Sequence, residues 1–265
     1  MTVDADLLRY YADEFDESDR LETKLRGRLE GIRVQELLRA YLGDRSQSVA
    51  DIGGGAGWHA IRLHADGHDV KLLDPIDRHV AEARAAGIDA VVGDARDLPW
   101  AAGEFDVALL AGPLYHLTDP LHRVCALREA VRVVRPGGCV AAVAHNRFAN
   151  VYGATLANQL DERWQVVEDI LRQGHSPHND RLPASSYYHS VTELVDEFNM
   201  SGLRRTRVHG VSGPGGWLGV IDDRYELGQD DDKLLRNAIE GARMADRYPE
   251  LTSASSILLA IGDVR

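Results

Sequence analysis

The strongest constraint on the fold is a repeated alternation of apolar runs and helical patterns between residues 48 and 145. The runs SVADI, HDVKLLD, DAVVGD, EFDVALLAG and CVAAVAH have the composition of strands. Helical patterns at residues 58–66, 78–86 and 120–134 lie between them, and residues 135–138, RPGG, have the composition of a turn. Strands that are apolar almost throughout are typical of a parallel sheet covered by helices on both faces.

The segments on either side of this alternation complete the predicted fold. Apolar residues recur at helical spacing over residues 4–42, and after His145 helices are expected around 158–173 and from about Val191. Strand patterns return at 203–211 and 255–264, with a helix around 231–248 between them. We predict an α/β fold with a doubly wound, mostly parallel seven-stranded sheet. Its parts are an N-terminal helical arm (1–47), a core (48–146), a helical lid insertion after the fifth strand (147–200) and the rest of the core (201–265).

A glycine cluster, VADIGGGAG at residues 49–57, forms the turn between the first strand and the first helix of the alternation. A dinucleotide fingerprint has the spacing G-x-G-x-x-G, whereas here the spacing is G-x-G-x-G and Trp58 stands where the third glycine would be. A phosphate-binding P-loop would end in Gly-Lys-Ser/Thr, which is absent. The turn therefore favours a ligand that approaches the backbone closely without a pyrophosphate.

Three acids stand at or near the ends of the first three strands. Asp51 precedes the glycines and can meet an ammonium group, and Asp74 can accept hydrogen bonds from ribose hydroxyls beside Pro75, an apolar wall for a purine. Asp94 and the Ala95 amide can read the edge of a purine ring. Singly, an aspartate at a strand end is often only a turn or N-cap residue. In this order, at the edge where doubly wound sheets bind ligands, the three indicate an adenosyl amino acid.

The same motifs carry a resemblance to a known family. VADIGGGAG, LLDP, VGDARDLPW, EFDVALLAGPLYHL and LREAVRVVRPGGCV resemble the class I S-adenosylmethionine (SAM)-dependent methyltransferase superfamily over residues 48–145. YYADEFDESDRL, GPLYHL and YYHSVTEL are similar to a bacterial branch of small-molecule methyltransferases. The resemblance implies a Rossmann-like methyltransferase fold whose last strand is antiparallel, with SAM as cofactor and S-adenosylhomocysteine (SAH) as product.

The resemblance also implies roles for single residues. The methionine side of SAM would be lined by Asp51, Gly53, Gly54, Gly55, Ala111 and Gly112. Asp74 would hold the ribose, and Asp94 with Ala95 the adenine. Tyr11 would close the pocket and Arg20 would pair with the SAM carboxylate, unless the two are a packed aromatic and a solvated arginine.

Methyl transfer needs the nucleophile, methyl group and sulfur in line, and a base only where the acceptor must lose a proton. Catalytic candidates are His116 and Tyr115, after the fourth strand, and Tyr11. The alternative for His116 is a helix cap or a contact to SAM. Aromatic walls suit a flat or apolar acceptor. The candidates for that wall are His145, Tyr188, His189 and Trp217, the last in a predicted glycine-rich loop, VSGPGGWLG at residues 211–219.

Composition limits the partners. The 42 acids and 30 bases give a net charge of −12, which disfavours nucleic acid. No apolar run reaches membrane-spanning length and the N-terminal segment is acidic, so we expect a cytoplasmic protein without a membrane partner. His175, His178 and His189 lack a cysteine or glutamate at ligand spacing, so no metal site is expected. Whether the chain forms a homo-oligomer stays open.

The leading hypothesis is an enzyme that transfers a methyl group from SAM to N, O or C of a small molecule, in specialised metabolism. The alternative is a SAM-binding protein without methyl transfer, either pericyclase-like or regulatory. A dinucleotide oxidoreductase is the third hypothesis.

Overall fold

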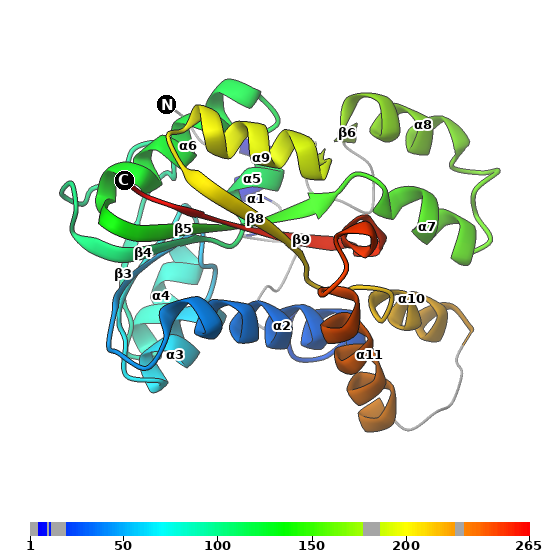
Figure 1. The fold of residues 1–265 in the computed structure, drawn as a ribbon, viewed down its shortest axis with the longest axis horizontal. Helices are drawn as coiled ribbons and strands as arrows, with labels where there is room; N and C mark the ends of the chain where they lie inside the picture. The colour runs from blue at the N-terminus through cyan, green and yellow to red at the C-terminus, as the bar shows by residue number, and fades with distance from the viewer. Residues whose placement is uncertain (1–4, 10, 12–19, 177–185, 226–230) are drawn as a thin grey trace.

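The structure is a computed structural model that describes residues 5–9, 11, 20–176, 186–225 and 231–265 (Figure 1). The elements within these ranges follow the predicted alternation closely. In chain order they are α1 (Ala5–Arg9), α2 (Leu25–Leu42), β1 (Ser48–Ile52), α3 (Trp58–Ala65), β2 (Asp69–Asp74), α4 (Asp77–Ala85), β3 (Asp89–Val92), β4 (Phe105–Leu110), α5 (Pro113–His116), α6 (Pro120–Val133), β5 (Val134–Asn146), α7 (Ala149–Leu156), α8 (Trp164–Gln173), β6 (His175–Ser176), β7 (Ser186–His189), α9 (Val191–Met200), β8 (Arg204–Gly210), α10 (Gly216–Tyr225), α11 (Asp231–Ala245), the 3-10 helix η2 (Pro249–Ala254) and β9 (Ile257–Asp263).

The sheet is doubly wound and mostly parallel, as predicted. Strands β3, β2, β1, β4 and β5 are neighbours in that order and pair in parallel. The last strand, β9, lies antiparallel between β5 and β8. The predicted number of strands was too low, because the sheet has nine among the described residues. The two additional strands, β6 and β7, lie in the insertion and are too short to show a periodic pattern.

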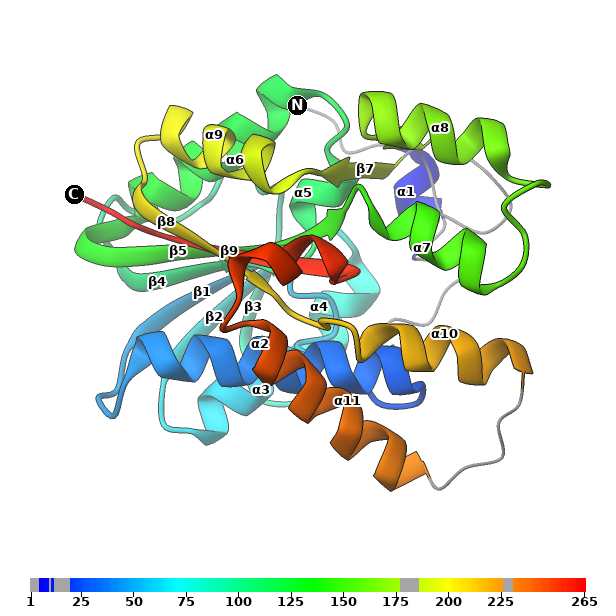
Figure 2. The same cartoon turned by 45° about the vertical axis from the view of Figure 1, so that its right-hand side comes forward.

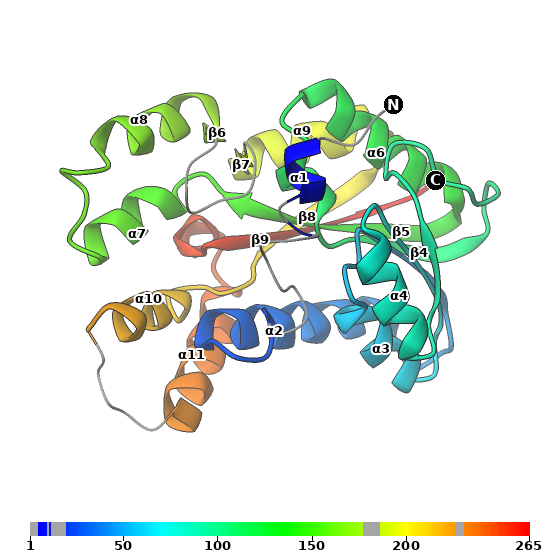
Figure 3. The ribbon, with the colours of Figure 1, turned by 180° about the vertical axis from the view of Figure 1, so that it is seen from behind.

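Helices cover both faces of the sheet and bury two separate apolar clusters. On one face Leu127 of α6 and Phe198 of α9 pack against strand residues. On the other face Val34 of α2, Leu63 of α3 and Val80 of α4 do the same. Figures 1 and 3 show the two helical layers on opposite sides of the strands. Since β1, β4 and β9 are buried on both faces over most of their length, their apolar runs are nearly continuous.

The helix α2 belongs to the body of the fold, although it lies in the segment predicted as an arm. Val34 and Leu38 are buried with β1 and β2, and Leu29 packs against Leu235 and Ala238 of α11. The segment from 147 to 200 supplies α7 and α8, which lie beyond the end of β5 rather than over a face of the sheet (Figures 1 and 2). The boundaries of the four parts remain predictions.

Residues 135–138 lie within β5, but the register between β4 and β5 shifts across them and Gly137 has the positive φ, 87°, that the predicted turn requires. Two other local predictions were wrong. The helix expected at 158–173 begins only at Trp164. The glycine-rich loop expected around Trp217 contains α10. In the described ranges, no helix combines the length and apolar character needed to span a membrane.

Candidate functional site

A cavity of about 660 Å³ opens at the carboxyl ends of β1, β2 and β4. It brings together most of the residues that the sequence analysis assigned to the cofactor and to catalysis. Those that line it are Tyr11, Arg20, Gly53, Gly54, Gly55, Asp74, Pro75, Asp94, Ala95, Ala111, Gly112, Tyr115 and His116.

The glycine turn between β1 and α3 forms one wall, and its backbone requires glycine. Gly53 has a φ of +68°, and a Cβ there would lie 2.7 Å from Pro113. A Cβ on Gly54 would lie 2.7 Å from the Asp51 carboxyl carbon. The Gly53 N–H donates to the Leu73 carbonyl at 2.6 Å, which ties the turn to β2. A ligand can therefore approach the main chain without meeting a side chain.

Asp74, at the end of β2, is buried at the base of the cavity. One carboxylate oxygen accepts the Gly55 N–H at 2.9 Å. The other accepts the Ile76 N–H at 3.0 Å and contacts His79 Nδ1 at 3.0 Å. A carboxylate offers about four acceptor positions. These three contacts leave Asp74 with room for roughly one more donor, such as one ribose hydroxyl.

Asp51 does not line the cavity. It lies fully buried on β1 beneath the glycine turn, and neither carboxyl oxygen has a well-aligned hydrogen-bond partner among the described residues. Burial and then the neighbouring Asp74 charge raise the pKa of Asp51 to about 7, against a smaller effect of the Ala60 N–H. The expected contact between Asp51 and an ammonium group stays a prediction; Asp51 does not line the cavity, and a Cβ on Gly54 would meet its carboxyl group.

The purine-reading positions after β3 lie on the cavity, but Asp94 already has a partner. The Arg96 guanidinium donates to both carboxylate oxygens of Asp94, at 2.9 Å and 2.5 Å. The backbone N–H of Arg96 donates to the same carboxylate. Burial by itself would raise the pKa of Asp94, but the bonds from Arg96 outweigh burial and lower it. Ala95 also lines the cavity.

An aromatic and imidazole cluster also lines the cavity. The Tyr11 hydroxyl lies 3.1 Å from His116 Nε2, and the Tyr11 ring contacts the rings of His79 and His116 edge-on. Burial lowers the pKa of His116 to about 4, opposed by the Asp74 charge and assisted by Arg20. His116 is therefore a neutral imidazole at pH 7, able to accept a proton or a hydrogen bond.

Arg20 and Tyr115 complete this side of the cavity. Arg20 forms an ion pair with Glu30 at 3.0 Å, so the Glu30 carboxylate already offsets part of the Arg20 charge before any ligand binds. The Tyr115 hydroxyl donates to the Ala111 carbonyl at 3.2 Å. This bond fixes the tyrosine ring over the end of β4.

The four residues predicted to contact the substrate do not line this cavity. His145 stacks on Tyr115, with ring centroids 4.2 Å apart, and faces a neighbouring cleft. Tyr188 is buried beside His145. Trp217 donates from its indole N–H to the Ala254 carbonyl at 2.7 Å, which attaches α10 to η2. These placements follow from the additional strand β7 and the helix α10, which the sequence pattern did not reveal.

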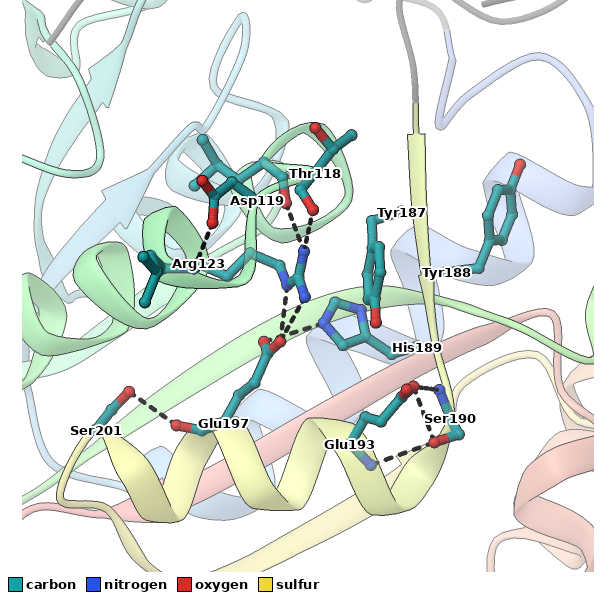
Figure 4. Close-up of polar contacts among 12 residues, drawn as sticks. Thr118, Asp119, Arg123, Tyr187, Tyr188, His189, Ser190, Glu193, Glu197 and Ser201 are labelled. Carbon is teal, nitrogen blue, oxygen red and sulfur yellow. Dashed lines mark hydrogen bonds and ion pairs between the residues drawn. The ribbon is translucent and has the colours of Figure 1, made fainter. Parts of the chain in front are cut away.

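His189 is fully buried in a polar network between α6, β7 and α9 (Figure 4). Its Nε2 lies 3.1 Å from Glu197, which also pairs with Arg123 at 2.7 Å. The Arg123 guanidinium donates to the carbonyls of Leu117 and Thr118, directly after α5. The network therefore supports the segment directly after His116, and Arg123, His189 and Glu197 do not line the cavity.

Several lining residues were missed. His79 of α4 contacts both Asp74 and Tyr11, and its position five residues after Asp74 on a helix was the only available signal. Trp58, at the position of the third dinucleotide glycine, also lines the cavity; its ring lies under the Arg62 guanidinium at 3.6 Å and its indole N–H donates to Glu22.

The histidines considered as metal ligands lie partly within the described ranges. Among the described residues, no group of three or more His, Cys, Asp or Glu side chains is arranged to hold a metal ion. His178 lies outside the described residues, and His189 is occupied by Glu197.

Comparisons with known proteins agree with this arrangement. A family model described as a methyltransferase domain matches residues 49–138. A 2-methyl-6-phytyl-1,4-hydroquinone methyltransferase of Oryza sativa is 33% identical over 67% of this chain and 56% of its own length. The 27-O-demethylrifamycin SV methyltransferase of Amycolatopsis mediterranei is 34% identical over 50% of this chain and 48% of its own length. The chain thus spans about half the length of these curated relatives.

Solved structures share the fold at low sequence identity. A SAM-dependent methyltransferase of Thermotoga maritima aligns with a TM-score of 0.58 and 16% identity, over 98% of this chain and 99% of its own. The cyclase SpnF aligns with a TM-score of 0.52 and 16% identity, over 87% of this chain and 80% of its own. With the sheet order and the cavity at its strand ends, these matches show that the chain belongs to the class I SAM-dependent methyltransferase superfamily.

Proposed function

We propose that this protein transfers a methyl group from SAM to N, O or C of a small molecule. The observation that carries the proposal is the convergence of the glycine turn, Asp74, the Asp94 and Ala95 positions, and Ala111 with Gly112 on one cavity. The cavity, at about 660 Å³, lies within the range of small-molecule sites, about 300–1,000 Å³.

The residues present fit SAM. The open glycine backbone suits the methionine portion, the remaining acceptor position of Asp74 suits a ribose hydroxyl, and Pro75 offers an apolar surface to the purine. Bound SAM would supply an activated methyl group on a sulfonium. Because Arg96 holds the Asp94 carboxylate, we assign adenine recognition mainly to the Ala95 backbone and only secondarily to Asp94.

The protein's part in the reaction would be to hold the acceptor in line and exclude water. Neutral His116 can accept a proton from a hydroxyl or amine acceptor, and Tyr11 orients the imidazole through its hydroxyl. Tyr115 supports the ring of His145 and borders the space where the acceptor would lie.

The class of acceptor, the metabolic role and the cellular location are also proposals. Similarity to enzymes named for a prenylated hydroquinone and for demethylrifamycin supports a small-molecule acceptor and specialised metabolism. The acidic composition supports the absence of a nucleic-acid partner, and we also propose a cytoplasmic location.

Isothermal titration with SAM, SAH and NAD is the first test. We expect SAM and SAH to bind and NAD to fail, because the turn lacks the third dinucleotide glycine. Binding of NAD without SAM would overturn the proposal.

Methyl transfer itself needs a second test, because likeness to the cyclase SpnF shows that this fold also occurs in a protein named for another reaction. Purified protein and tritiated SAM are incubated with a small-molecule extract of the cells in which the protein naturally occurs, and labelled products are separated. Tight SAM binding with no labelled acceptor would favour the alternative, a SAM-binding protein without methyl transfer.

A further inference from the structure

A second cleft, of about 290 Å³, lies directly beside the main cavity. Arg20 lines both spaces. Tyr115, on the wall of the main cavity, stacks on His145, which lines the second cleft, with ring planes only 3° from parallel. A molecule in the second cleft would therefore lie next to the residues proposed for methyl transfer.

The buried side of this cleft is polar. The Ser255 hydroxyl donates to the Ile257 carbonyl at 2.6 Å, so in its contact with Ser212 it acts as the acceptor. Ser212 then accepts both the Ser256 N–H at 3.0 Å and the Ser256 hydroxyl at 2.9 Å. Because the N–H bond remains in place, the Ser256 hydroxyl can turn its proton toward a ligand without leaving Ser212 unsatisfied.

His145 adds a second polar group to the buried side. Its Nδ1 is buried and has no hydrogen-bond partner among the described residues. Burial, with the nearby charges of His116, Arg20 and Arg26, lowers the pKa of His145 to about 3. The ring is neutral at pH 7 and can donate one N–H to a ligand.

The exposed side of the cleft is cationic. It is lined by Arg20, Lys24 and Arg26 against the single carboxylate of Glu30, with which Arg20 is paired. In the described part of the chain, neither Lys24 nor Arg26 has an ion pair or side-chain hydrogen bond. The helix α2 also begins here, and Lys24 provides no side-chain cap for its first amide groups. An excess of positive charge at one cleft contrasts with the net charge of −12 of the whole chain.

We propose that this cleft binds a carboxylate or phosphate group carried by the methyl acceptor. Arginine, lysine, a serine hydroxyl and the positive end of a helix are the groups that hold such anions. Anchored there, the rest of the acceptor extends past Tyr115 toward His116. The inference rests on the proposed function, because it names the class of molecule that the enzyme would methylate.

The first experiment measures anion binding to the protein saturated with SAH. Benzoate, benzamide and inorganic phosphate are titrated calorimetrically. We expect benzoate or phosphate to bind and benzamide not to bind, and the stronger of the two anions identifies the carboxylate or phosphate class. Equal binding of benzoate and benzamide, or no binding of either anion at millimolar concentration, would contradict the proposal.

Variants then locate the bound anion. Arg26→Gln is expected to weaken anion binding by about tenfold, as for the loss of a charge-assisted hydrogen bond. Arg45→Gln removes the same charge at the other end of α2, where residue 45 is exposed, and is expected to leave binding almost unchanged. Equal effects of the two variants would show that the anion responds only to net charge.

The same titrations separate this inference from two other outcomes. If SAH displaces benzoate, the cations serve the SAM carboxylate and the proposed acceptor site is wrong. If SAH itself fails to bind, the proposed function fails. Anion binding to the SAH-free protein that responds to Arg26→Gln would then still assign an anion site to the cleft, but not a methyl acceptor.

Discussion

Burial has set the charge state of the ionisable side chains around the cavity. His116 and His145 are held neutral, with pKa values lowered to about 4 and about 3, while the pKa of Asp51 is raised to about 7. Asp74 keeps three hydrogen-bond contacts from its own surroundings. Burial therefore affects the protonation of His116, His145 and Asp51, whereas Asp74 contributes through its hydrogen bonds. Single substitutions can measure these effects one at a time.

Asp74→Asn is expected to weaken SAH binding by about 1–3 kcal/mol, because the amide loses charge and an acceptor position. Calorimetric titration of SAH measures the change. Asp77→Asn, an exposed residue in the first turn of α4, is the matched control and should bind like the wild type. Unchanged affinity for Asp74→Asn would remove this residue from the cofactor site.

His116→Ala is expected to lower turnover about 100-fold while changing SAH affinity much less, if His116 is the base. Its base form is populated above a pKa of about 4, so its contribution to turnover should be constant from pH 6 to 9 and fall toward pH 4. Label transfer from tritiated SAM gives the rates. His64→Ala, exposed on α3, is the control. An equally large loss of SAH affinity would indicate a cofactor contact instead.

Asp51→Asn is expected to become more stabilising as the pH rises from 4 to 7. The folded state binds a proton at Asp51 up to a pKa of about 7, whereas the unfolded state releases it near the ordinary pKa of 3.8. The wild type therefore loses stability across this window, by at most about 4 kcal/mol. Urea unfolding of both proteins at several pH values measures the difference, with exposed Asp69→Asn as control. A difference independent of pH would show that Asp51 does not titrate there.

At the scale of elements, the site depends on how α5 is held. This helix has only four residues, so it cannot be stable by itself. Arg123 of α6 donates to the carbonyls of Leu117 and Thr118, the two residues directly after α5. Glu197 of α9 forms an ion pair with Arg123 (Figure 4). The helices α6 and α9, which are more than 50 residues apart in the sequence, thus together hold the end of α5 and with it His116.

Arg123→Met is expected to lower the free energy of unfolding by about 3–5 kcal/mol, because Glu197 would be left buried without its cation. The double variant Arg123→Met, Glu197→Met should recover part of the loss. Arg128→Met, on the exposed face of α6, is the control and should change stability little. Urea unfolding measures all four proteins. A double variant less stable than Arg123→Met alone would contradict an uncompensated charge as the cause.

For the whole molecule, the cavity joins segments that are far apart in sequence. Tyr11 and Arg20 come from the N-terminal segment, Asp74 and Asp94 from strand ends, and His116 from the end of α5. A ligand that contacts all of them binds only the folded chain, and it stabilises that chain by mass action.

SAH at 100 times its dissociation constant is expected to stabilise the fold by about 2.7 kcal/mol, which corresponds to a rise in melting temperature of roughly 5–10 °C. NAD at the same concentration should leave the melting temperature unchanged. Differential scanning fluorimetry measures both. A rise with NAD equal to that with SAH would contradict a SAM-specific cavity.

The sequence by itself determined the central strands and most of the cavity. Continuous apolar runs require strands buried on both faces, and the carboxyl ends of parallel strands meet at one edge, so the residue pattern alone places Asp74, Asp94 and the glycine turn together. These features depend on local pattern and on a general rule of sheet topology. Asp51 was placed correctly on its strand but not beneath Gly54, because a pattern of strands does not reveal what covers a side chain.

Only the tertiary structure decided what each side chain contacts. The strand β7 has four residues and pairs with the last two residues of β5, so no local sequence pattern predicts it. In the structure this strand places His189 next to Glu197 and away from the cavity. The cationic cleft is likewise built from the start of α2, the end of β5 and the serines near β9. Contacts between residues so distant in sequence depend on the packing of whole elements, and packing is a property of the folded chain rather than of any one segment.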